Sequence, residues 1–311
     1  MYVVSASPHT RTNNSVNKIM RDVFISLLPI VGASIYFYKM DALKIILASV
    51  ITCIVTEAIW QKLCKKSVTI NDFSAAITGL ILAFVLPTHV PIWIPIIGGI
   101  FAIIVVKQFF GGFAQNFMNP ALAAKIFLLT SWSAAMIKPV TDAASSASEA
   151  TEAVTSASEA VTTALPSLWE VFIGQATGNI GEVSILALCI GALYLIIRGV
   201  IDLKIPASYL ITVALASWIF GKEGFFTGDV VRTLMTGSII LTAFFCANDY
   251  SSTPITTKGK IIFGVGAGLM TILFRVYGYN TEGAYYSILI MNVVTPIIDR
   301  INVIGLKEET A

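Results

Sequence analysis

Long apolar stretches constrain the fold of this 311-residue chain more than any other feature. About ten of them, separated by short segments rich in proline, glycine and charge, are close to the length at which a helix crosses a bilayer. Only 12% of the residues are charged, whereas a soluble domain is roughly 25% charged. The sequence therefore predicts an all-α membrane protein with about ten transmembrane helices. We expect them at residues 23–38, 43–61, 72–86, 91–107, 119–135, 184–199, 205–220, 231–247, 259–275 and 283–298.

The third and fifth of these stretches are short, so we expect them to be tilted, broken or buried inside the helix bundle. The two groups of five also share a pattern. Residues 78–82 (Thr-Gly-Leu-Ile-Leu) in the third stretch are echoed by residues 236–240 (Thr-Gly-Ser-Ile-Ile) in the eighth. Because five spans is an odd number, a duplicated unit inserts in opposite orientations. The pattern favours two inverted repeats, although chance produces threonine–glycine pairs before aliphatic residues as well.

Basic residues predict the orientation, because cytoplasmic loops of membrane proteins are enriched in lysine and arginine. With a cytoplasmic N-terminus, thirteen lysines and arginines, Lys107 among them, fall on the inside and six on the outside. We therefore predict that both termini are cytoplasmic. The net charge of +2 argues against a nucleic-acid partner and leaves the lipid bilayer as the expected surroundings. The predicted parts are a cytoplasmic segment at 1–22, five-helix halves at 23–136 and 184–299, an extracytoplasmic loop at 137–183 and a cytoplasmic tail at 300–311.

The predicted extracytoplasmic loop contains a repeated unit with the frame acidic-x-x-[Ser/Thr]-x-Ala-[Ser/Thr]. Its copies are residues 142–148 and 152–158, and a decayed third copy at 159–165 ends in leucine. The unit resembles the recognition sequence of flavin transferases, which attach FMN through a phosphoester to a hydroxyl side chain. Only the first copy combines an aspartate with a terminal hydroxyl, so Ser148 is the predicted attachment site and Ser158 the reserve. The alternative is a flexible, low-complexity linker without a cofactor.

Four further segments carry glycine, asparagine and proline motifs at the ends of the predicted spans. They are residues 111–122 (GGFAQNFMNPAL), 172–182 (FIGQATGNIGE), 247–259 (ANDYSSTPITTKG) and 275–300, which ends in TPIIDR. Together with the loop, these segments resemble the RnfD/NqrB family nearly from end to end. The shorter N-terminal segment favours the RnfD branch.

The resemblance implies a flavin-carrying membrane subunit of an ion-translocating ferredoxin:NAD oxidoreductase, in a complex that pumps sodium ions or protons. It implies a covalent FMN and a second, noncovalent flavin such as riboflavin. It also implies a prokaryotic plasma membrane location and no activity of the chain alone. The implied partners are other membrane and peripheral subunits, including an extracytoplasmic flavin-bearing subunit, and a flavin transferase.

Candidate cofactor residues follow from the same resemblance. Glycine allows close backbone approach, and asparagine offers amide donors and acceptors, which suits an isoalloxazine ring. The same residue types also cap helices, which is the alternative explanation. The candidates for the noncovalent flavin are Gly111, Gly112, Asn116 and Asn119, and those that cover the FMN are Gly174, Asn179 and Glu182.

Acidic residues inside membrane spans are costly and usually functional. Glu57 lies within the second stretch, Asp72 begins the third and Asp249 follows the eighth, so these three are candidates for the ion path. A buried hydrogen-bonded role explains Glu57 equally well, and pairing with Lys258 would satisfy Asp249. The four cysteines are far apart and form no CxxC pair, so we expect no metal site within the chain. The alternative function is an inverted-repeat transporter or channel without a redox cofactor.

Overall fold

The computed structural model describes residues 15–66, 69, 72–137, 168–174, 178–221, 224–226, 228–277 and 282–308. Most of these residues are helical, in agreement with the predicted all-α class. The strands among the described residues are an antiparallel pair of two residues each, β1 (Phe220–Gly221) and β2 (Gly224–Phe225). Ser148 and Ser158 lie outside the described residues.

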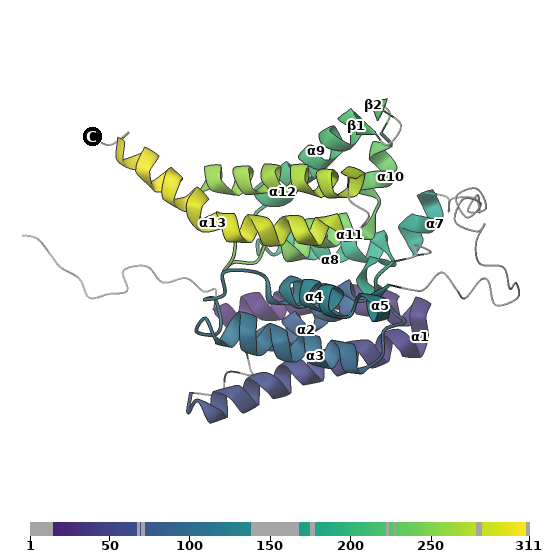
Figure 1. Cartoon of the computed structure of the whole chain (residues 1–311), viewed down its shortest axis with the longest axis vertical. Helices are drawn as coiled ribbons and strands as arrows, with labels where there is room; N and C mark the ends of the chain where they lie inside the picture. Colours follow the sequence, from purple (N-terminus) through teal and green to yellow (C-terminus); the bar gives the residue numbers. More distant parts are fainter. Residues whose placement is uncertain are drawn as a thin grey trace, which may run out of the picture.

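The helices of the first half pack side by side in the lower part of Figure 1. The longest, α1, is broken at Lys39, whose backbone angles (φ 50°, ψ −125°) are not helical. The first two expected spans therefore lie on either side of this break. The elements of this half are α1 (Val16–Leu63), α2 (Ser74–Val85), α3 (Trp93–Phe101), the π-helix η2 (Ala102–Gln108), α4 (Pro120–Ser131) and α5 (Ser133–Met136).

Helix α2 lies at the centre of the first half, and all 12 of its residues are buried. The expectation that the short third stretch is buried inside the bundle is thus confirmed. Gly79 allows this packing, because a Cβ at this position would lie 2.7 Å from the Cα of Val50 in α1. Small residues at such crossings let two membrane helices approach closely.

We expect Gly79→Ala to lower the stability of the folded chain. The added methyl group meets backbone, which cannot rotate away, and overpacking of this kind costs roughly 1–3 kcal/mol. Gly32→Ala is the matched control, because nothing lies within 4 Å of a Cβ at that helical position. Thermal unfolding of the detergent-solubilised protein measures both variants. Equal midpoints for the two would contradict the close α1–α2 contact.

The second half occupies the upper part of Figure 1, with α8 and α11 nearest the first half. Its interruptions are a short 3₁₀ helix, η4, and a second π-helix, η5. The elements are α7 (Leu168–Ile173), η4 (Ile180–Glu182), α8 (Ile185–Ile197), α9 (Lys204–Ile219), α10 (Val230–Leu234), α11 (Gly237–Leu241), η5 (Thr242–Cys246), α12 (Thr257–Tyr277) and α13 (Gly283–Glu308).

The two halves meet mainly where α1 packs on α8. Arg198 at the end of α8 donates to the Asp22 carboxylate through Nε (3.2 Å) and Nη2 (3.0 Å). Gly191 brings the helix backbones together, because a Cβ there would lie 2.3 Å from the carbonyl oxygen of Ser26. This contact fixes the residues of both halves that surround the site described below.

Among the described residues, two helices, α1 and α12, are long and apolar enough to cross a membrane by length and composition. Six further apolar helices among the described residues have 10–17 residues, and two of them, Trp93–Gln108 and Gly237–Cys246, run through η2 and η5. The count of ten spans therefore stays a prediction.

The inverted repeat also stays a prediction. The two matching threonines occupy different positions in their helices, because Thr78 lies inside α2 and Thr236 is the residue before α11.

Candidate functional site

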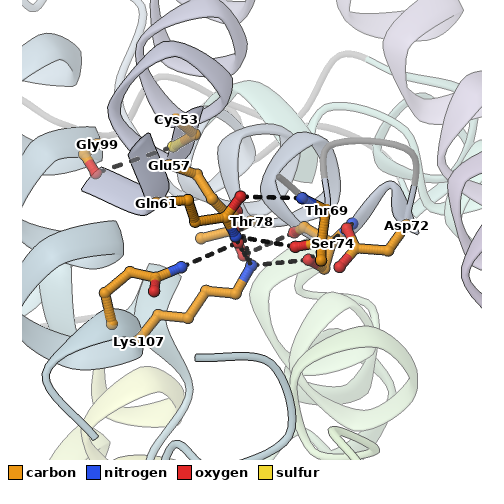
Figure 2. A network of polar contacts seen from close by, with 10 residues as sticks. Cys53, Glu57, Gln61, Thr69, Asp72, Ser74, Thr78, Gly99 and Lys107 are labelled. Atoms are coloured by element: carbon orange, nitrogen blue, oxygen red, sulfur yellow. Dashed lines mark hydrogen bonds and ion pairs between the residues drawn. The ribbon is translucent and has the colours of Figure 1, made fainter. Parts of the chain in front are cut away.

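A buried ion pair links α1 to the end of η2 (Figure 2). The ammonium of Lys107 lies 2.9 Å from Oε1 and 2.8 Å from Oε2 of Glu57. The exposed fractions are only 3% for Lys107 and 1% for Glu57. Lys107, which the positive-charge rule counted on the cytoplasmic side, is buried, and its charge is balanced by a carboxylate inside the bundle. Removal of either partner leaves an uncompensated buried charge.

Two amide side chains complete the surroundings of the Glu57 carboxylate. Gln108, the residue after Lys107, donates to Oε1 at 3.0 Å, and Gln61, one helical turn after Glu57, donates to the same atom at 3.2 Å. The consecutive residues Lys107 and Gln108 both reach Glu57 from η2, and π-helical turns are frequent at functional sites. Both oxygens of the carboxylate thus accept hydrogen bonds from protein side chains.

The same network extends to the start of α2. Lys107 donates to the hydroxyl of Ser74 at 2.7 Å, and that hydroxyl donates to Oδ1 of Asp72 at 2.8 Å. Asp72 also accepts the backbone N–H of Ser74, the first residue of α2, at 2.9 Å. The structure therefore brings the predicted ion-path residues Glu57 and Asp72 into one cluster, joined by Lys107 and Ser74.

Two cavities adjoin this cluster, and Phe113 lines both of them. Ser74 and Lys107 line a central cavity between the two halves, to which α8 and the 248–251 segment contribute. Gln61 and Gln108 line an outer cavity, together with residues that include Asp72, Gly111 and Gly112. Residues of the Glu57 cluster therefore contribute to the lining of both cavities.

The predicted residues Asn116, Asn119 and Asp249 all line the central cavity. Asn116 donates to Oδ2 of Asp249 at 3.3 Å, across 133 residues of sequence. Asn119 caps α4, because its Oδ1 accepts the backbone N–H groups of Ala121 (3.1 Å) and Leu122 (3.3 Å). Its Nδ2 donates to the carbonyl of Cys246 at 3.4 Å. The cap explanation thus holds for Asn119, and both polar atoms of its amide have protein partners.

Asp249 is held by uncharged groups instead of the expected Lys258. Its carboxylate accepts hydrogen bonds from the hydroxyls of Ser251 (3.1 Å) and Ser252 (3.3 Å) besides that from Asn116. No ion pair joins it to a base within the part of the chain that the structure describes. Burial raises the pKa of Asp249, and these hydrogen bonds oppose the rise.

A second buried cluster contains the candidates Asn179 and Glu182. Asn179 donates to Oε1 of Glu182 at 2.7 Å and to Oε1 of Glu282 at 3.2 Å. Lys125 of α4 pairs with Glu282 at 2.9 Å, and its ammonium lies 5.4 Å from the centre of the Tyr285 ring. The Tyr285 hydroxyl donates to Glu182. This cluster ties α4 of the first half to α13 of the second.

Known proteins match the chain over nearly its whole length. The model of the NQR2, RnfD, RnfE family matches residues 3–304. The chain belongs to this family. A relative from Acetobacterium woodii, named as the D subunit of the Na(+)-translocating ferredoxin:NAD(+) oxidoreductase complex, is 46% identical over 96% of this chain and 92% of its own length. A proton-translocating counterpart from Clostridium ljungdahlii is 38% identical over 96% of this chain and 94% of its own length.

Family membership confirms the resemblance seen in the sequence, and the structure locates the candidate glycines of this RnfD-type chain. Gly111 and Gly112 follow η2 with φ values of 122° and 110°, at which other residues are strained. Gly174 (φ 149°) follows α7, and a Cβ there would lie 2.2 Å from the Phe37 ring. These positions require glycine for backbone and packing reasons alone.

Lys107, Ser74, Lys125 and Tyr285 were not singled out as site residues by the sequence. The signal was the presence of lysines in apolar stretches, because a lysine inside a membrane protein needs an acidic partner. The sequence does not identify that partner, since Lys107 and Glu57 are 50 residues apart and Lys125 and Glu282 are 157 apart.

Proposed function

We propose that this chain is the D subunit of an ion-translocating ferredoxin:NAD oxidoreductase complex, and that it carries FMN covalently on Ser148. The observation that carries the subunit assignment is the full-length match to two relatives named as that subunit, at 46% and 38% identity. The other subunits of the complex are then its partners. We include among them an extracytoplasmic flavin-bearing subunit. The attachment motif also requires a flavin transferase as a partner.

A second, noncovalent flavin fits the central cavity by the chemistry of its lining. Phe113, Phe244 and Tyr250 supply aromatic surface, and Asn116 and Asn248 supply amide groups beside the cavity. An isoalloxazine ring needs such apolar faces together with hydrogen-bonding groups at its edge. When bound, the flavins would carry the electrons, and the chain would hold the flavins in place. Asn116 would hold the ring edge, with Asp249 fixing the orientation of the Asn116 amide.

Mass spectrometry of the wild-type chain, coexpressed with its flavin transferase, tests the flavin assignment. We expect one peptide from residues 137–167 to gain the mass of FMN less one water, because a phosphoester forms with loss of water. The unmodified peptide from cells lacking the transferase is the control. If no peptide in this range is modified, the segment is a linker without a cofactor, and the subunit assignment rests on the relatives alone.

The proposed topology places both termini in the cytoplasm and residues 137–167 outside. In support, α7, which follows this segment, lies at the opposite end of the bundle from the end of α13 (Figure 1). We expect a cysteine introduced in the 137–167 segment to react with a membrane-impermeant thiol reagent added to intact cells. A cysteine at Thr256, in the predicted cytoplasmic segment before α12, should react only after lysis. The opposite labelling pattern would invert the orientation.

A further inference from the structure

Two charged side chains, Lys107 and Asp249, line the central cavity in the described part of the chain. The charge of Lys107 is balanced, because its ammonium lies 2.8 Å from Oε2 of the buried Glu57. Asp72, which joins that cluster through Ser74, lines the outer cavity and not the central one. Asp249 is thus the charged group of the central cavity that no ion pair among the described residues balances.

The hydrogen bonds of Asp249 favour its ionised form. Oδ2 accepts from the amide of Asn116 at 3.3 Å and Oδ1 from the backbone N–H of Ser251 at 3.4 Å, and these N–H groups can only donate. The hydroxyls of Ser251 (3.1 Å) and Ser252 (3.3 Å) add one bond to each oxygen. Burial disfavours the charge, but hydrogen bonds donated to a carboxylate favour it. The wall of the central cavity therefore carries a negative charge.

The apolar part of the wall lets this charge act across the cavity. Buried aliphatic and aromatic side chains, among them Ile77, Ile81 and Phe245, belong to the lining. Charges interact more strongly in such surroundings than in water, because the local dielectric constant is lower. A second charge that forms inside the cavity is therefore subject to the field of Asp249.

We propose that Asp249 lowers the reduction potential of the flavin in the central cavity. This role rests on the proposed function, which puts a noncovalent flavin there, and it is separate from the orientation of Asn116. The oxidised isoalloxazine ring is neutral, and one electron that arrives without a proton makes the ring an anion. A carboxylate in the wall disfavours that anion relative to the neutral ring. The lower potential makes the flavin a stronger electron donor to the next carrier in the complex.

Spectroelectrochemical titration of the purified full-length chain tests the proposal. The chain is expressed without the flavin transferase and loaded with riboflavin, so that riboflavin is the one flavin in the sample, and dithionite supplies the electrons. In the wild type, the potential should lie below that of free riboflavin in the same detergent buffer. Asp249→Asn should raise the potential by about 59 mV or more, which corresponds to a shift of about tenfold in the ratio of oxidised to reduced flavin for one electron.

Asp249→Glu and Asp41→Asn are the matched controls. Glutamate keeps the negative charge at position 249, so the potential in this variant should stay near that of the wild type. If Asp249 acted through its shape alone, the glutamate and asparagine variants would both shift the potential. Asp41 has a side chain that is 71% exposed in α1, and the loss of its charge should leave the potential unchanged.

Equal potentials in Asp249→Asn and the wild type would overturn the proposal, because the position would then exert no field on the added electron. A wild-type potential at or above that of free riboflavin would overturn it as well. This second comparison needs no variant, so it decides the question if Asp249→Asn does not fold. A wild type that binds no riboflavin would refute the flavin assignment of the central cavity and this proposal together. Bound riboflavin whose potential ignores Asp249 would refute this proposal and leave the flavin assignment intact.

Discussion

Ser148→Ala is expected to abolish flavin fluorescence in the denatured protein band. The isoalloxazine ring stays intact when FMN is attached through its phosphate, so a covalently labelled chain fluoresces on a denaturing gel. Alanine lacks the hydroxyl that forms the phosphoester, and no other group at this position can replace it. Because attachment is all or none at one side chain, the expected loss is complete, down to the background of unlabelled protein.

Ser158→Ala is the matched control, because it removes the same hydroxyl from the second copy of the motif, in which Glu152 replaces the aspartate of the first. This variant should keep the fluorescence of the wild type. If Ser158→Ala loses fluorescence and Ser148→Ala keeps it, the second copy is the attachment site and the mechanism stands. Fluorescence that survives both substitutions would exclude the motif as the carrier.

Glu57→Gln is expected to reduce ion transport by the assembled complex about tenfold or more while flavin content stays unchanged. Glutamine keeps the shape of the side chain and can accept a hydrogen bond from Lys107, but it carries no charge. It therefore cannot balance the charge of a translocated cation. Transport into membrane vesicles, driven by the redox reaction of the complex, measures the effect.

Asp41→Asn is the control for this experiment, because it removes an acid from the same helix at a site whose side chain is 71% exposed. Its transport should equal that of the wild type. Normal transport by Glu57→Gln at normal expression would make Glu57 a structural residue, satisfied by Lys107 and the two glutamines. Loss of flavin in this variant would instead indicate misfolding.

Local sequence identified several helix ends correctly because capping depends on neighbouring residues. Asn119 before Pro120 predicted the start of α4, where Asn119 caps the first turn and proline occupies the first helical position. Gly111 and Gly112 marked the end of η2 through their positive φ angles. The sequence could not show that Asn116, beside these residues, is oriented by Asp249 in the other half of the chain.

The sequence by itself determined the all-α class and the family, because apolar composition and short motifs can be recognised without knowledge of the packing. It also marked Glu57 as unusual, since an acid in an apolar helix needs a partner. Only the tertiary structure decided that the partner is Lys107. In an apolar stretch every helical face looks suitable for burial, so periodicity does not tell which side chains meet. Lys107 reaches Glu57 from η2, and the close α1–α2 crossing brings Ser74 to the same pair. Both are contacts between segments that lie far apart in the sequence.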